Sequence, residues 1–88
     1  MPSSAETVGP RAALAAALRA AGLPPSVYWI EEVHQPAPLP PDFLYLRRVP
    51  GDTARWETGG YERGRWTPYA LHGDESGACA HLRHLLLG

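Results

Sequence analysis

The sequence predicts an α+β domain with two layers, in the order helix, four strands, helix. Three observations support this: an alanine- and leucine-rich run near the N-terminus, β-favouring runs separated by proline and glycine turns, and a C-terminal run with helical apolar spacing. Two helices on one face of an antiparallel meander sheet is the simplest arrangement that buries both apolar stripes. At 88 residues, the chain is expected to form a single domain, 1–88, with a frayed start over 1–7.

Composition limits the classes of partner and the compartment. Eight basic residues, all arginine, stand against nine acidic ones, and this balance argues against nucleic-acid binding. A single cysteine excludes an internal disulfide. The N-terminus does not show the basic segment followed by an apolar segment that is typical of a signal peptide. The run Ala12–Ala21 is too short and too charged to cross a membrane. We therefore expect a cytoplasmic protein that binds neither membrane nor nucleic acid.

The first helix is predicted over residues 10–21. Pro10 is suited to its first position, where a missing N–H costs nothing. Leu14 and Leu18 lie four residues apart and form one apolar stripe. Gly22 is expected at the position just after the helix, and the following prolines prevent the helix from resuming.

The first strand is predicted over Ser26–Val33. Its alternation places Tyr28 and Ile30 on one face and Trp29 on the other. We expect Tyr28 and Ile30 to point inward, because the opposite choice would bury Glu31. Trp29 is then expected on the outer face.

Proline and glycine divide the remainder of the chain. Four prolines within residues 36–41 predict a stiff, extended connection that cannot pair as a central strand. Pro68 places its strand at the edge of the sheet, and Gly59-Gly60 marks a bulge or a close approach. Asp74 is a suitable N-cap for the last helix, which carries Cys79 in its apolar stripe. The remaining strands are predicted at Asp42–Val49, 55–62 and 65–71.

No metal site, cofactor site or catalytic residue is predicted. His81 and His84 are three residues apart, but further ligands would have to come from His34 or His72 in loops, so we interpret them as surface histidines. Cys79 is interpreted as a core residue rather than a nucleophile. The charged residues of the third and fourth strands are interpreted as cross-strand ion pairs; these are Arg55, Glu57, Glu62, Arg63 and Arg65.

The aromatic residues are the most informative feature. Three Trp, four Tyr and one Phe are many for a core covered by two alanine-rich helices. Either they fill the space that the small alanines leave, or several remain accessible on the open face of the sheet. Trp, Tyr and Arg dominate binding hot spots, so an accessible set would indicate a protein-binding surface. We expect Trp56 beneath the helices and Trp66 on the outer face.

A family resemblance adds to this reading. The residues that carry it in the C-terminal half are Trp56, Tyr61-Glu62-Arg63-Gly64, Tyr69 or Leu71, Glu75 and Ala78-Cys79-Ala80. In the N-terminal half they are Leu14 and Leu18, Ala21-Gly22, Tyr28-Trp29-Ile30 and Phe43-Leu44-Tyr45-Leu46. With them the chain resembles small single-domain proteins of GC-rich bacteria that look like immunity partners of polymorphic toxins. The resemblance implies a non-enzymatic protein that binds a toxin domain and blocks its active site.

The predicted partner-binding residues combine aromatic and acidic side chains: Trp29, Glu31, Glu32, Asp42, Trp66 and Tyr69. The three acidic residues have no Lys or Arg close by in sequence, and we expect them to meet a basic toxin cleft and speed association. The alternative function is a small structural module that self-associates through the open sheet, which would make a homo-oligomer. A small enzyme or ligand carrier is a third possibility and requires a pocket lined by converging polar groups.

Overall fold

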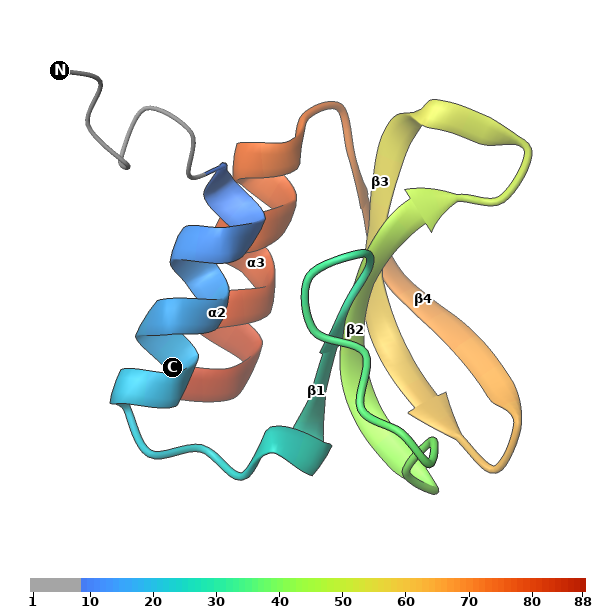
Figure 1. Cartoon of the computed structure of the whole chain (residues 1–88). Helices are drawn as coiled ribbons and strands as arrows, with labels where there is room; N and C mark the ends of the chain where they lie inside the picture. Colours follow the sequence, from blue (N-terminus) through green and yellow to red (C-terminus); the bar gives the residue numbers. More distant parts are fainter. Residues whose placement is uncertain (1–8) are drawn as a thin grey trace, which may run out of the picture.

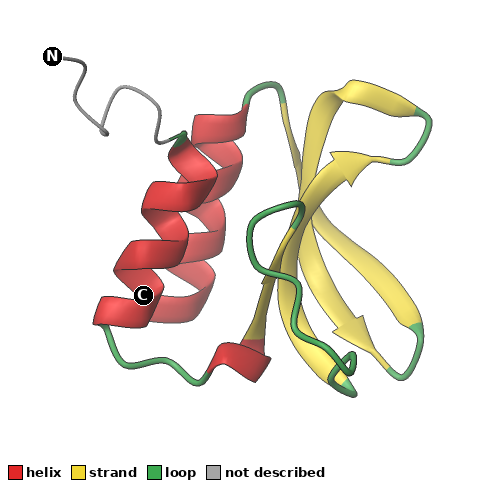
Figure 2. Ribbon diagram, in the orientation of Figure 1, coloured by secondary structure: helices red, strands yellow, loops and turns green. Residues whose placement is uncertain are grey.

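A computed structural model of the chain describes residues 9–88, so the frayed start expected for 1–7 lies outside the described residues. The elements are α2 (Pro10–Ala20), a 3₁₀ turn η1 (Pro25–Val27), β1 (Tyr28–Ile30), β2 (Asp42–Val49), β3 (Asp52–Glu62), β4 (Arg65–His72) and α3 (Glu75–Leu87). Figure 1 shows α2 and α3 side by side on one side of the four-stranded sheet. The two helices and the sheet confirm the α+β class, and Figure 2 shows the two layers by secondary structure.

The sheet is mixed, which corrects the prediction of a purely antiparallel meander. The strand order is β1-β2-β3-β4, and β2, β3 and β4 are antiparallel neighbours. β1, however, pairs parallel to β2, with Tyr28 opposite Leu44 and Ile30 opposite Leu46. The reason lies in residues 31–41, where a turn is followed by the proline-rich stretch. Four of the six residues 36–41 are prolines without an N–H, so this stretch does not pair as a strand. It runs back along the molecule, and β2 therefore starts at the end of the sheet where β1 also starts.

The first strand is also shorter than the predicted Ser26–Val33. Pro25–Val27 forms the 3₁₀ turn instead, and the strand ends at Ile30 because the Ile30 N–H donates to the His34 carbonyl across a tight turn. The predicted faces are confirmed. Tyr28 and Ile30 are buried towards the helices, while Trp29 is half-buried among aromatic rings of the other face.

The end of α2 and the start of α3 are as the sequence predicts. Gly22 has φ of +81° after α2, its N–H donates to the Arg19 carbonyl, and the Leu23 N–H donates to the Leu18 carbonyl. This is the Schellman arrangement, in which glycine adopts the left-handed conformation at little cost. At the start of α3, the Asp74 carboxylate accepts a hydrogen bond of 2.7 Å from the Gly77 N–H, which confirms it as the N-cap.

The core lies between the helices and the facing side of the sheet. Its buried members are Leu14, Ala15, Leu18, Tyr28, Ile30, Leu46, Trp56, Ala78, Cys79 and Leu82. Cys79 is confirmed as a core residue, and burial raises the pKa of its thiol to about 11. A thiol with this pKa is almost entirely protonated at neutral pH, so it is a poor nucleophile.

Gly59 and Gly60 mark both features that the sequence predicted, a bulge and a close approach. The β3–β4 register shifts between Thr58 and Gly59. A Cβ at Gly59 would collide with the Thr67 carbonyl oxygen and lie 2.7 Å from the Tyr45 hydroxyl. The missing side chain therefore lets the Tyr45 ring lie directly over β3.

The β3–β4 hairpin closes through a two-residue turn, Arg63-Gly64. Both residues have positive φ, 50° for Arg63 and 85° for Gly64. Positive φ at both positions defines a type I′ turn, which prefers Asn-Gly. Arginine in the left-handed region is strained, so a residue that tolerates positive φ at this position should stabilise the turn.

We expect Arg63→Asn to raise the free energy of unfolding by about 0.5–1 kcal/mol, because asparagine tolerates the left-handed region better. Arg63 makes no ion pair with any described residue, and its N–H, which donates to the Pro41 carbonyl, is retained in the variant. Urea denaturation measures the change. Arg65→Asn, an identical substitution within the strand, is the control and should not stabilise. A loss of stability in Arg63→Asn would contradict the assignment of strain to this residue.

Candidate functional site

Five aromatic rings cluster on the side of the sheet that faces away from the helices. We call this set the aromatic face: Trp29, Phe43, Tyr45, Tyr61 and Trp66. The Trp66 ring is at its centre and meets the other four edge-to-face, with ring centroids 4.8–5.8 Å apart. Phe43 and Tyr61 stack at 4.5 Å. Every strand contributes at least one ring, so the sheet itself holds the cluster in place.

The aromatic face has a buried layer and an accessible layer. Tyr45 and Phe43 are buried, with 0% and 5% of their surface exposed. Trp29, Tyr61 and Trp66 are half-buried and form the accessible layer. In Figure 1 neither helix lies on this side of the sheet. The face therefore presents partly exposed, tightly held rings to solvent.

A charged group lies beneath this layer. Glu57 is 3% exposed and accepts hydrogen bonds from the Tyr45 hydroxyl and from Arg47 Nε, the latter at 3.1 Å. Burial, together with the Glu57 carboxylate, raises the pKa of Tyr45, which stays a protonated donor. The Arg47 guanidinium also covers the Trp66 ring, 4.4 Å from its centroid. These contacts fix the positions of the rings above them and leave the carboxylate paired.

Trp56 is held on the helix side between two arginines. The guanidinium carbons of Arg11 and Arg48 lie 5.0 Å and 4.7 Å from its ring centroid. Both distances are within the range of a cation–π contact. Trp56 itself is 7% exposed, so the two arginines complete its enclosure.

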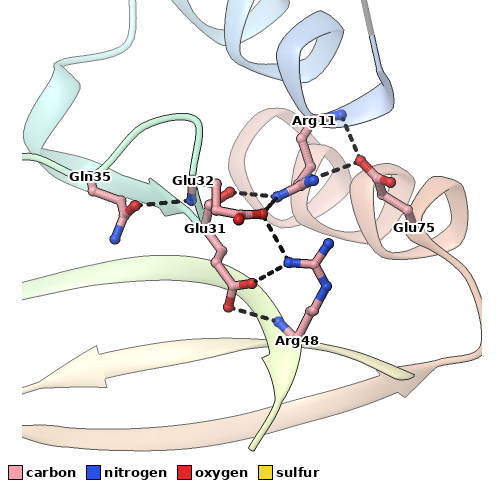
Figure 3. Close-up of polar contacts among 6 residues, drawn as sticks. All are labelled: Arg11, Glu31, Glu32, Gln35, Arg48 and Glu75. Atoms are coloured by element: carbon pink, nitrogen blue, oxygen red, sulfur yellow. Dashed lines mark hydrogen bonds and ion pairs between the residues drawn. The ribbon is translucent and has the colours of Figure 1, made fainter. Parts of the chain in front are cut away.

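The same two arginines bind three carboxylates, as Figure 3 shows. Arg11 pairs with Glu75 at 2.8 Å and with Glu32 at 2.9 Å. Arg48 pairs with Glu31 at 2.8 Å and with Glu32 at 2.9 Å. Hydrogen bonds from Arg48 and Arg11 lower the pKa of Glu32. The network links α2, α3, β2 and the turn after β1.

The structure divides the six predicted partner-binding residues among three places. Trp29 and Trp66 meet in the aromatic face, with ring centroids 5.2 Å apart. Glu31 and Glu32 belong to the ion-pair network around Trp56, whose arginines are far from them in sequence. Asp42 begins β2 opposite Glu62, at the other end of the sheet. The six therefore do not form one surface.

Tyr69, the sixth residue, lies apart from Trp66. Its ring closely approaches Gly60, and it lines a hollow with Leu44 and Leu86, residues that pack against the helix-side core.

Sequence reasoning missed the role of Phe43, Tyr45 and Arg47 in the aromatic face. Their spacing of two along β2 was the available signal, because alternate residues of a strand share a face.

The predicted cross-strand ion pairs are found in part. Glu57 pairs across strands with Arg47, at 3.1 Å from its Nη2. Arg55 pairs instead with Asp52 in its own strand. Among the described residues, Glu62, Arg63 and Arg65 make no ion pair.

Two histidines flank one buried hydroxyl. The Thr58 Oγ1 lies 3.0 Å from His72 Nε2 and 2.6 Å from His81 Nδ1, and Thr58 is fully buried. The two imidazole rings are 5.1 Å apart. Desolvation, and then the neighbouring His81, lower the pKa of His72, while Asp74 opposes the shift. No group of three potential metal ligands occurs within 9–88.

Stability is expected to fall on acidification between pH 7.5 and 5.5. The His72 pKa is lower in the folded than in the unfolded chain, so this contribution is complete above about pH 6.5 and is lost as pH falls through the folded value. Urea denaturation at the two pH values measures it. His72→Gln should flatten the difference, whereas His84→Gln, at an exposed histidine of α3, should not. Equal flattening by both variants would contradict the assignment.

Comparison with known proteins gives no relative: no family model, curated protein or solved structure matches the chain. Neither described helix has the length and apolar character needed to cross a membrane.

Proposed function

We propose that the chain is a non-enzymatic protein-binding domain, and specifically an immunity protein that binds and neutralises a bacterial toxin domain in the cytoplasm. The aromatic face is the observation that carries this proposal. Partly exposed Trp and Tyr rings beside an arginine are the side chains that contribute most to protein interfaces.

The rigidity of the aromatic face supports binding. Trp66 contacts four rings and Arg47, so little side-chain entropy remains to be lost when a partner covers it. Both helices pack against the other face of the sheet, so neither of them covers the aromatic face. The resemblance to toxin immunity proteins names the class of that partner, and Trp29 and Trp66 are the proposed contact residues.

Co-expression tests the proposal. Cells that express the toxin domain encoded by a neighbouring gene should survive when this chain is present, and the two proteins should co-purify. Trp29→Ala and Trp66→Ala should weaken protection, once circular dichroism shows that each variant is folded. Arg19→Ala, on an exposed site of α2, is the control and should protect fully. Cell death that is independent of this chain would contradict the immunity function.

Light scattering addresses self-association through the same face. A concentration-independent monomer is expected if the face is reserved for a different protein. A stable homodimer that Trp66→Ala converts to a monomer would favour the alternative, a self-associating structural module.

A further inference from the structure

We propose that a hollow at the end of the sheet, next to the start of β2, takes the side chain of an arginine presented by the protein partner. The proposal rests on the proposed function of the chain as a protein-binding domain. The hollow has a volume of about 450 Å³, within the range of ordinary ligand pockets. It lies at the opposite end of β2 from the ion-pair network around Trp56.

The walls of the hollow suit the aliphatic part of an arginine. Val27, Leu44 and Leu86 line it, and each packs partly buried against the core. Gly60 belongs to the lining, and the ring of Tyr69 comes close to it. Arginine stems pack along apolar surfaces of this kind while the charged end stays polar.

Two carboxylates lie at the polar side of the hollow. Asp42 and Glu62 face each other as partners of β2 and β3, and both line the hollow. Such cross-strand neighbours have Cβ atoms about 5 Å apart, close enough to share one guanidinium. They are also distinctive, because every other carboxylate side chain within 9–88 has an ion pair or a hydrogen bond.

Elsewhere in the chain, an arginine completes the combination of an aromatic ring and a carboxylate that the hollow contains. Arg11 and Arg48 each lie over Trp56 while paired with carboxylates, and Arg47 lies over Trp66 while paired with Glu57. Each of these arrangements joins an aromatic ring, a carboxylate and an arginine. The hollow has the ring of Tyr69 and the carboxylates of Asp42 and Glu62, but no arginine lines it.

Arg65 is a candidate partner within the chain itself. Arg65 lies opposite Glu62 in the β3–β4 hairpin, but the two residues make no ion pair and Arg65 is not part of the lining.

Arginine is preferred over lysine as the occupant because its planar group binds two carboxylates and stacks on a tyrosine ring. Phe43 and Tyr61 belong both to the lining of the hollow and to the aromatic face. The other walls, Leu44 and Leu86, are on the helix side of the sheet. A partner that reaches around the end of the sheet from the aromatic face can therefore place an arginine in the hollow.

A small probe tests the hollow without the partner. Nα-acetyl-arginine methylamide is titrated into the ¹⁵N-labelled chain at low salt, and Nα-acetyl-citrulline methylamide, its neutral counterpart, serves as the reference. We expect saturable shifts of the amide signals of Gly60, Thr67 and Tyr69, with a dissociation constant on the order of 1 mM. The citrulline probe should bind at least about tenfold more weakly, because it has no charge for the carboxylates.

Variants locate the effect. The double variant Asp42→Asn and Glu62→Gln should lose the preference for the arginine probe, and Tyr69→Ala should weaken binding; all three residues are exposed, so the fold should be retained. Asp52→Asn changes a half-buried carboxylate that pairs with Arg55 at the far end of β3, and this variant should bind like the unmodified chain. Equal shifts with both probes, shifts elsewhere, or no shift at 20-fold the expected constant (~20 mM) would overturn the proposal.

The result is separate from the test of the immunity function. If cells are protected but the arginine probe does not bind, the hollow proposal fails and the aromatic face remains the contact surface. If the probe binds but cells are not protected, the hollow stands as an arginine site and the immunity function fails.

Discussion

Trp56→Ala is expected to lower the free energy of unfolding by about 3–5 kcal/mol, the range for removing a buried large aromatic side chain. Trp56 is 7% exposed in the core, and Arg11 and Arg48 cover its ring. Truncation would create a cavity and also remove both cation–π contacts. A domain of this size has roughly 5–10 kcal/mol of stability in total, so the variant should be close to unfolding.

Urea denaturation followed by circular dichroism measures this loss. Trp66→Ala is the matched control, because it removes the same side chain from the partly exposed aromatic face. Its expected cost is smaller, about 1–3 kcal/mol, since the Trp66 ring is already in contact with solvent. A larger cost for Trp66→Ala than for Trp56→Ala would mean that the aromatic face, rather than the helix-covered core, holds the domain together.

Glu57→Ala is expected to cost about 2–4 kcal/mol, although glutamate is usually a surface residue. The carboxylate accepts from the Tyr45 hydroxyl and pairs with Arg47. Its removal leaves a fully buried hydroxyl without its partner and a half-buried guanidinium without its counter-charge. The loss therefore reflects polar groups left unpaired more than it reflects lost apolar area.

A double-mutant cycle with Tyr45→Phe separates these contributions. If the hydroxyl and the carboxylate stabilise the fold together, the double variant should cost about 1–2 kcal/mol less than the sum of the single variants. Glu62→Ala is the control, because this exposed carboxylate has no ion pair within the described chain, and its expected effect is within about 0.5 kcal/mol. Additive effects of Glu57→Ala and Tyr45→Phe would contradict a shared role.

The face of the sheet on which the aromatic residues of β1 and β2 lie followed from local sequence. Alternation along the first strand separated Tyr28 and Ile30 from Trp29, because successive side chains of a strand point to opposite faces. Phe43, Tyr45 and Arg47 are alternate residues of β2 and therefore share one face. The contribution of β2 to the aromatic face was thus also present as a pattern in the sequence. The edge position of Pro68 follows from its missing N–H, and β4 is indeed at the edge.

The partners of the charged residues could not be predicted in the same way. Glu31 and Glu32 have no basic neighbour in sequence, yet the fold brings Arg48 and Arg11 to them. Asp42 has the same local character and remains without an ion pair among the described residues. An ion pair depends on which strands and helices become neighbours, and the separation in sequence carries no information about that.

The sequence by itself determined the elements with local causes: the end of α2, the start of α3, the turn at Arg63-Gly64, the bulge at Gly59 and the inward face of β1. Backbone conformation and side-chain alternation depend on a few adjacent residues, so these features can be predicted from short stretches of the sequence. Only the tertiary structure decided that β1 runs parallel to β2, and which charges meet. Strand direction depends on the path of residues 31–41 through space, and an extended, unpaired segment has no local signal for where it returns.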